Sequence, residues 1–511
     1  MENKKRFFYN GIMLTAVGIA MRTVALFFNA FVTQKIGAEG MGLYTIVMTV
    51  YGFAVTFATS GISLTVTRLV ASAKGENREE DTRAILLGAV LYSLAFSLIA
   101  TMALFFGASF IAGGILNDVR AENALKILAP SLIPLSLVSV FSGYFVGVRR
   151  VSCNAVTQIL GQTFKVCATV WLVIRAMPMN VERAAFALSV GTTITEILAF
   201  AVIFIEFIID RRKSNDGAKG GADVRSVASM AIPLGISAYI RQALLTLEHI
   251  LIPKRLRASG DTLSESLSAY GTLHGMALPM ILYPMVTLSS FSGLLVPEFA
   301  ERSSAKNTSA MSRIASRAFS VTLIYATLSS CVLYIFSEEL GYVIYKSADA
   351  GKYIAVLAPV IPIMYLDHVT DSVLKGIGEH VYSMWVNITD SLLSVALVWI
   401  LIPKMGIMGY AVCIIAMEAY NFILSLLRLF KRIKFKISLT DTILLPLLSA
   451  AVSSFLVRES FIRAGRQTLP LWLVLEIVFS ICMFAGVYRI LIIITTYAKL
   501  KFKLEKTINN N

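Results

Sequence analysis

Charged residues are scarce in this sequence. Only 15% of the 511 residues are Asp, Glu, Lys or Arg, whereas 57% are hydrophobic. Soluble domains usually carry about 25% charged residues, and a soluble chain of this length could not bury so much apolar surface. The scarcity of charge therefore excludes a soluble multidomain protein and predicts a polytopic membrane protein.

Cysteine and histidine patterns that bind metals or form disulfides are also missing. The five cysteines are odd in number and scattered in or beside apolar runs, which predicts packing residues. His249 and His368 have no second His or Cys at ligand spacing, so we expect no metal. The loops lack a cluster of catalytic carboxylates or histidines, which argues against an enzyme.

Long apolar runs are what the sequence has in abundance. Runs of roughly 20 residues are typical of transmembrane helices, and the first is too long for a cleaved signal peptide. The pattern predicts an all-α polytopic membrane protein with about fourteen transmembrane helices. We expect them at residues 9–33, 43–70, 84–106, 123–147, 154–175, 184–209, 226–252, 268–297, 314–336, 353–375, 382–402, 406–428, 440–457 and 471–496.

The distribution of Lys and Arg predicts the orientation. With the N-terminus inside, the inside segments hold 27 of these residues and the outside segments hold 14. The positive-inside rule therefore predicts that both termini are cytoplasmic. Basic loops beside anionic headgroups account for much of the net charge of +15, so no nucleic-acid partner is expected. Five basic residues lie within predicted spans: Arg22, Arg68, Lys165, Arg241 and Arg489.

An internal repeat predicts two halves. ALKILAPSLIP, ending at Pro134, resembles YIAVLAPVIP, ending at Pro362, and the 229-residue separation of their LAP triplets also relates Gly147 to Gly376. The Gly-rich, charged segment 211–225 is typical of a linker. We predict two pseudo-symmetric six-helix lobes. Their limits are 1–210 and 226–436, and two more helices with a cytoplasmic tail follow at 437–511. Parallel repeats of this kind are typical of transporters.

Arginines reach mid-membrane in the first predicted helix of each lobe. Arg22 shares a helix face with Asn29, and Arg241, next to Gln242, shares one with Glu248. A central arginine costs about 3 kcal/mol, so a cavity or partner is expected. Because a guanidinium matches phosphate geometry, we predict a cationic cleft. An Arg241–Glu248 pair that only fixes helix register is the structural alternative.

Carboxylates gather in the second predicted lobe. Asp367, Asp371 and Lys375 recur every four residues, and Asp390 and Glu418 lie in the next two helices. Asp371 is placed to pair with Lys375. The four acids are candidates for coupling to an ion or a proton, and equally for hydrogen bonds between helices.

The segment from Arg22 to Glu76 resembles the polysaccharide-flippase branch of the multidrug/oligosaccharidyl-lipid/polysaccharide exporter superfamily, which includes lipid II flippases. The pieces IGAEGMGLYT and SGISLTVTRLVA carry the resemblance. It implies lobes that rock between inward- and outward-open states, and a lipid-linked sugar diphosphate as cargo. It also implies that Arg22 and Arg241 line a cationic cavity, with Arg68 as a third candidate, and that the last two helices help to hold the lipid tail.

These observations together predict a flippase of the bacterial plasma membrane. It would carry a peptidoglycan precursor such as lipid II from the inner to the outer leaflet, next to membrane lipids and enzymes of cell-wall synthesis. Asn29 and Gln242 would contact sugar, and no cofactor beyond a coupling ion is expected.

Two other hypotheses stay open. One is a cation-coupled multidrug exporter that uses Glu248, Asp367 or Asp371. The other, of a different class, is a membrane scaffold or glycosyltransferase of wall synthesis.

Overall fold

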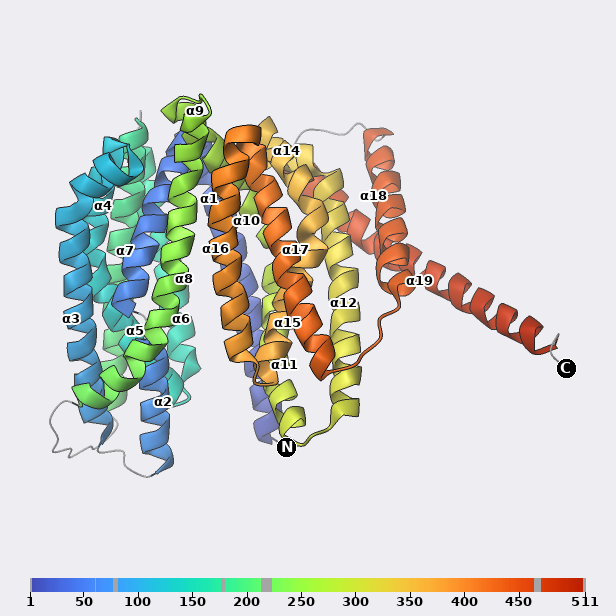
Figure 1. Cartoon of the computed structure of the whole chain (residues 1–511), viewed down its shortest axis with the longest axis horizontal. Coiled ribbons are helices and arrows are strands. Elements are labelled where there is room, and N and C mark those ends of the chain that lie inside the picture. The colour runs from blue at the N-terminus through green and yellow to red at the C-terminus, as the bar shows by residue number, and fades with distance from the viewer. Residues whose placement is uncertain are drawn as a thin grey trace. The chain divides into compact units, whose positions relative to one another are not determined.

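The computed structural model describes residues 2–59, 61–76, 81–175, 180–212, 223–463 and 470–508. Every regular element in these ranges is helical, as predicted. A helix pairs its backbone N–H and C=O groups internally, which is necessary in a membrane because lipid tails offer no hydrogen-bond partners. The chain divides into two compact units: unit 1 is residues 1–275 and 391–410, and unit 2 is residues 276–390 and 411–511. The long helices of each unit stand side by side (Figure 1).

Unit 1 holds the elements from the N-terminus to the start of η4. They are α1 (Glu2–Thr59), α2 (Ile62–Gly75), α3 (Asp81–Phe110), η1 (Ile111–Leu116), η2 (Val119–Ala121), α4 (Glu122–Leu128), η3 (Ala129–Ser131), α5 (Leu132–Gly147), α6 (Val151–Arg175), α7 (Val181–Arg212), α8 (Val224–Ala258) and α9 (Leu263–Tyr270). Three elements cross the boundary between the units, namely η4 (Gly271–Ala277), α16 (His380–Met405) and α17 (Ile407–Arg432).

Unit 2 holds the remaining elements. They are α10 (Leu278–Leu282), α11 (Met285–Ser304), α12 (Thr308–Ile335), α13 (Ser337–Tyr345), α14 (Ala348–Leu357), η5 (Ala358–Val360), α15 (Ile361–Gly376), η6 (Thr440–Leu444), α18 (Leu445–Arg463) and α19 (Pro470–Ile508).

The number of membrane spans depends on how two breaks are counted. Among the described residues, twelve helical segments are long and apolar enough to cross a membrane, and a pair bent by 54° at 283–284 makes a thirteenth if it is one span. The first segment, Ala20–Lys74, has 55 residues, whereas one span needs about 20. Gly37 interrupts it with φ 74° and ψ 177°, a conformation that favours glycine. This segment therefore contains most of the predicted helix 9–33 and all of the predicted helix 43–70.

Prolines lie at three other breaks, as expected from their missing N–H. Pro130 and Pro359 lie in the 3₁₀ turns η3 and η5, and Pro284 lies at the bend between α10 and α11. The short helix α13 was not predicted from the sequence.

The local geometry of the two halves agrees with the predicted repeat. α5 and α15 each have 16 residues and begin 229 positions apart. In unit 1, Thr101 Oγ1 donates to the Ala129 carbonyl at 3.1 Å. In unit 2, Ser330 Oγ donates to the Ala358 carbonyl at 2.7 Å. Each carbonyl belongs to the first residue of its 3₁₀ turn, so one helix-to-turn contact recurs at the same separation.

The lobe limits 1–210 and 226–436 stay a prediction. Most of the predicted linker 211–225 lies outside the described residues, because 213–222 are not described. The helices predicted within 437–511 are α18 and α19.

Candidate functional site

The helix α8, which carries Arg241, lies against the part of α1 that follows the break at Gly37, whereas Arg22 lies in the part that precedes it. Tyr239 OH on α8 donates to the Phe57 carbonyl on α1 at 3.4 Å. Further along α8, Gln242 faces Gly52, where an added methyl group would lie 3.6 Å from Gln242 Nε2. Later residues of α8 thus meet earlier residues of α1, so these segments are antiparallel. Gln242 is half-buried at their interface.

Arg22 and Arg241 both have exposed side chains far from helix ends. Arg241 is the middle residue of the 35-residue helix α8. Arg22 precedes the break at Gly37 by about four turns. Each therefore lies roughly 20 Å or more from the nearest end or break, farther than a snorkelling side chain reaches. Neither makes a hydrogen bond or ion pair with another described residue.

The hypothetical pair between Arg241 and Glu248 does not form. Glu248 is only 7% exposed, whereas the side chain of Arg241 is exposed. Seven residues of helix separate the two side chains by about 10 Å along the axis, too far for an ion pair. The interpretation of this pair as a device that fixes helix register is therefore wrong.

Three further residues that the sequence analysis singled out in unit 1 are Asn29, Arg68 and Lys165. Asn29 is half-buried, and its Oδ1 accepts from Thr33 Oγ1 at 3.3 Å. Arg68 is exposed on α2, and no hydrogen bond or ion pair links it to another described residue. Lys165 on α6 lies within electrostatic range of Glu196 on α7.

The structure contains a pair of histidines near Glu248 that the sequence analysis did not predict. The ring centroids of His249 on α8 and His274 in η4 lie 4.5 Å apart, and His249 Nδ1 lies 3.2 Å from the hydroxyl of Tyr270. The α8–α9 hairpin brings the two rings together, so spacing along one helix could not indicate the pair. No group of three or more His, Cys, Asp or Glu side chains in the described ranges is arranged to hold a metal ion.

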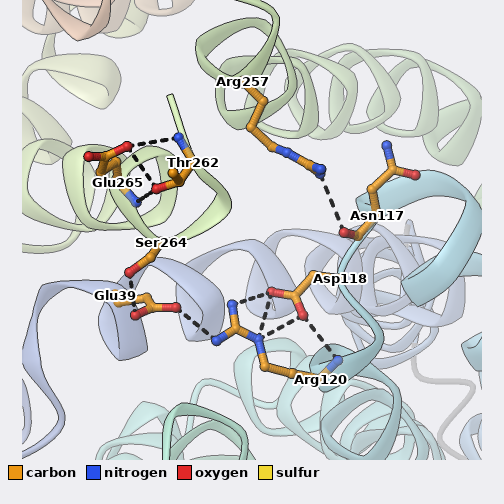
Figure 2. Close-up of polar contacts among 8 residues, drawn as sticks. All are labelled: Glu39, Asn117, Asp118, Arg120, Arg257, Thr262, Ser264 and Glu265. Carbon is orange, nitrogen blue, oxygen red and sulfur yellow. Dashed lines mark hydrogen bonds and ion pairs between the residues drawn. The ribbon is translucent and has the colours of Figure 1, made fainter. Parts of the chain in front are cut away.

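Beyond this pair, a polar network joins three segments of unit 1 (Figure 2). Arg120 donates from Nη1 to Glu39 Oε1 and from Nη2 to Asp118 Oδ2, each at 2.8 Å. Ser264 Oγ donates to the other oxygen of Glu39 at 2.6 Å. Nearby, Arg257 at the end of α8 donates to the Asn117 carbonyl at 3.4 Å. The network ties the turn in α1 to η2 and to the start of α9.

The backbones of α1 and α9 approach closely beside this network. A methyl group added to Gly42 would overlap the Leu267 backbone, and one added to Gly271 would overlap the Ala38 carbonyl. Only glycine fits at these two contacts, so this part of α9 is packed directly on α1. The residues that meet are more than 200 positions apart, which is why the sequence alone did not reveal the contact.

Unit 2 gathers the predicted acids from three helices. The charges of Glu418 on α17 and of Asp371 on α15 act on Asp367, as does that of Asp390 on α16. Asp367 Oδ1 is buried with no hydrogen-bond partner among the described residues. The predicted pair of Asp371 with Lys375 is confirmed. The four acids therefore lie within electrostatic range of one another on three helices, and their role in coupling stays a prediction.

Comparisons with known proteins identify the family to which this chain belongs. Residues 7–303, more than half of its length, match the polysaccharide biosynthesis protein family. The chain belongs to this family. Residues 263–400 also match the MatE family. Stage V sporulation protein B of Bacillus subtilis (strain 168) is 26% identical over 425 residues, which cover 81% of each chain. Sporulation protein YkvU of the same organism is 19% identical and covers 75% of this chain and 87% of that one.

Solved structures have the same fold. The lipid II flippase MurJ, in an inward closed conformation, has a TM-score of 0.71 at 14% identity and covers 94% of this chain and 100% of its own. An inward-facing multidrug resistance transporter of the MATE family in the MOP superfamily has a TM-score of 0.65 at 12% identity, covering 82% and 98%. The chain is thus a multi-pass membrane protein of the polysaccharide biosynthesis protein family, and it has the fold of these solved transporters.

Proposed function

We propose that this chain is a flippase for a lipid-linked sugar diphosphate, with a peptidoglycan precursor such as lipid II as cargo. It would move the headgroup from the inner to the outer leaflet of the bacterial plasma membrane by alternating access, with both termini in the cytoplasm. Because two relatives are named sporulation proteins, a role in sporulation is part of the proposal.

The observation that best supports the proposal is that two arginines within the membrane are exposed and lack a described protein partner. Arg22 and Arg241 are exposed, lie far from helix ends and have no protein partner among the described residues. An arginine at such depth is costly unless it faces water or an anion. A diphosphate supplies several oxygens for the guanidinium fork, so Arg22 and Arg241 would hold the diphosphate in a cationic cleft.

The other groups fit this cargo in simple ways. The amides of Asn29 and Gln242 are half-buried on the same two helices and would contact sugar hydroxyls. Arg68 would meet the headgroup nearer the helix end. The polyprenyl tail would stay in lipid or against α18 and α19, because an apolar chain is more stable in an apolar environment than in a polar cleft.

The acidic cluster of unit 2 would supply coupling. Asp367, Asp371, Asp390 and Glu418 form a cluster of carboxyl groups in the membrane, and such groups commonly mark ion or proton pathways. A cation or proton bound there would favour one state of the transport cycle over the other.

A second candidate function is a cation-coupled multidrug exporter. The MatE match and the fold of the multidrug transporter favour it, and Glu248, Asp367 or Asp371 would then bind the coupling cation. A drug-stimulated proton or sodium flux that Asp367→Asn abolishes would support this function.

The class of cargo is tested with purified protein in proteoliposomes. The proposal predicts that fluorescent lipid II moves its headgroup across the bilayer faster than in protein-free vesicles, while a cationic drug does not drive cation flux. Drug-driven flux without movement of lipid II or another lipid-linked sugar would contradict the proposal and favour the exporter.

A further inference from the structure

A second basic site lies in unit 2, apart from the two membrane arginines. Arg313 and Arg317 are one turn apart near the start of α12, and Lys434 and Lys436 lie in the segment that joins α17 to α18. All four side chains are exposed and line one cavity of about 730 Å³. Cavities of this size are typical of sites for small ligands.

The segment that carries the lysines is fixed to α12. Ser312 Oγ donates to the Lys434 carbonyl, and Ser316 Oγ donates to the Lys436 carbonyl, each at 2.7 Å. Between the lysines, Phe435 is 8% exposed, and its ring lies 4.8 Å from that of Phe319. The exposed Lys434 and Lys436 flank the buried Phe435 in the chain, and both lysines line the same cavity as the arginines.

The positive charge in this cavity is not balanced by the protein. None of the four cations forms an ion pair with a described residue, and no carboxylate lines the cavity. Three other cations in the same two predicted loops are paired, namely Arg302 with Glu298, and both Arg428 and Arg432 with Glu379, whereas Lys306 and Lys431 form no ion pair with a described residue. Four like charges held together repel one another, so an anion would stabilise this arrangement.

Apolar surface adjoins the cations. Val321, one turn beyond Arg317 on α12, is 51% exposed, and Leu439 and Leu444, just beyond Lys436, are 63% and 53% exposed. A molecule with a phosphate and acyl chains matches this order of charge followed by apolar surface. The positive-inside rule predicts that this end of α12 is cytoplasmic, and basic pockets between helices on that side bind anionic headgroups.

We propose that Arg313, Arg317, Lys434 and Lys436 form a binding site for the phosphate of an anionic phospholipid in the adjacent leaflet. The guanidinium groups and ammonium groups contact the phosphate oxygens, and the acyl chains lie along Val321, Leu439 and Leu444. Because the lysines belong to the connection between α17 and α18, a bound lipid also fixes the position of the last two helices relative to α12 within unit 2.

The site is tested by lipid binding to the full-length protein in detergent, measured by native mass spectrometry. Phosphatidylglycerol and phosphatidylcholine with identical acyl chains are titrated in parallel. The double variants are Lys434→Gln with Lys436→Gln, and Arg313→Gln with Arg317→Gln. Each should weaken phosphatidylglycerol binding by about fivefold or more and leave phosphatidylcholine binding unchanged. Lys434→Arg with Lys436→Arg should bind like the wild type, which separates lost charge from lost folding.

A matched control removes two charges elsewhere, with Lys352→Gln and Lys404→Gln. An equal loss of phosphatidylglycerol binding in this control would overturn the site and assign the effect to net charge. Two further experiments add inorganic phosphate or undecaprenyl diphosphate as a competitor of phosphatidylglycerol. The proposal expects neither to displace phosphatidylglycerol at equal concentration. Displacement by phosphate would make this a site for free anions, and preferential binding of the diphosphate would make it a cargo site, so either result would contradict the proposal.

Discussion

At the residue scale, the chemistry of single side chains could be predicted but their partners could not. Arg22 and Arg241 stood out because charge is rare inside apolar runs, and the structure leaves both without a described protein partner. The pairing of Asp371 with Lys375 followed from helix spacing. The His249–His274 pair and the ion pairs of Glu379 did not, because their partners come from other helices.

Glu379 gives a pH-dependent prediction. Hydrogen bonds from Arg428, and then from Arg432, lower the pKa of this carboxyl from its ordinary value of 4.5. A lowered folded-state pKa means that the ion pairs stabilise the fold above the unfolded-state pKa and are lost as pH falls through the folded-state pKa. Glu379→Gln should therefore destabilise the protein by roughly 1 kcal/mol at pH 7, and the difference from wild type should shrink below about pH 4.

Thermal unfolding of wild type and Glu379→Gln between pH 7 and pH 3 measures this difference. A gap in Tm that stays constant across the range would show that the carboxylate charge of Glu379 does not stabilise the fold.

At the element scale, long apolar runs predicted most helices, but the sequence did not predict where helices break or which helices contact one another. α3, α6, α7 and α16 were each expected within about four residues of their observed ends, whereas α8 ends six residues later than expected and α12 begins six residues earlier. The break between α1 and α2 falls inside the predicted helix 43–70, because Gly61, with φ 75°, looks from sequence like an ordinary small residue in a membrane helix. The packing of α9 on α1 depends on Gly42 and Gly271, which no local pattern distinguishes from other glycines.

The network around Arg120 should be important for the contact between α1, η2 and α9. Arg120→Ala leaves the carboxylates of Glu39 and of the 5% exposed Asp118 without their cation. We expect a loss of about 1–2 kcal/mol, because Arg120 itself is partly solvated. Lys126→Ala removes a neighbouring i,i+4 pair with Glu122 and should cost about 0.3–0.5 kcal/mol.

Tryptophan fluorescence during heating of the detergent-solubilised variants gives both values. Equal Tm values for Arg120→Ala and Lys126→Ala would contradict a special role for the network.

At the scale of the whole molecule, composition and repeat were sufficient to predict an all-α membrane protein, and a stretch near the N-terminus was sufficient to indicate the superfamily. The LAP triplets predicted a repeat, and the recurring contacts of Thr101 and Ser330 agree with it. The division into compact units was not predictable, because it assigns η4, α16 and α17 in parts to different units, and that depends on contacts far apart in sequence.

The central claim is that Arg22 and Arg241 hold the diphosphate of the cargo. Arg489 on α19 is a matched control, since it is also an exposed arginine within a candidate span and has no partner among the described residues. The decisive measurement is the initial rate of lipid II headgroup translocation in proteoliposomes for Arg22→Ala, Arg241→Ala and Arg489→Ala. We predict a loss of at least about tenfold for the first two, as expected for a lost charge-assisted contact, and a rate near wild type for the third. Translocation that is unchanged in Arg22→Ala and Arg241→Ala, or equally reduced in Arg489→Ala, would contradict the account.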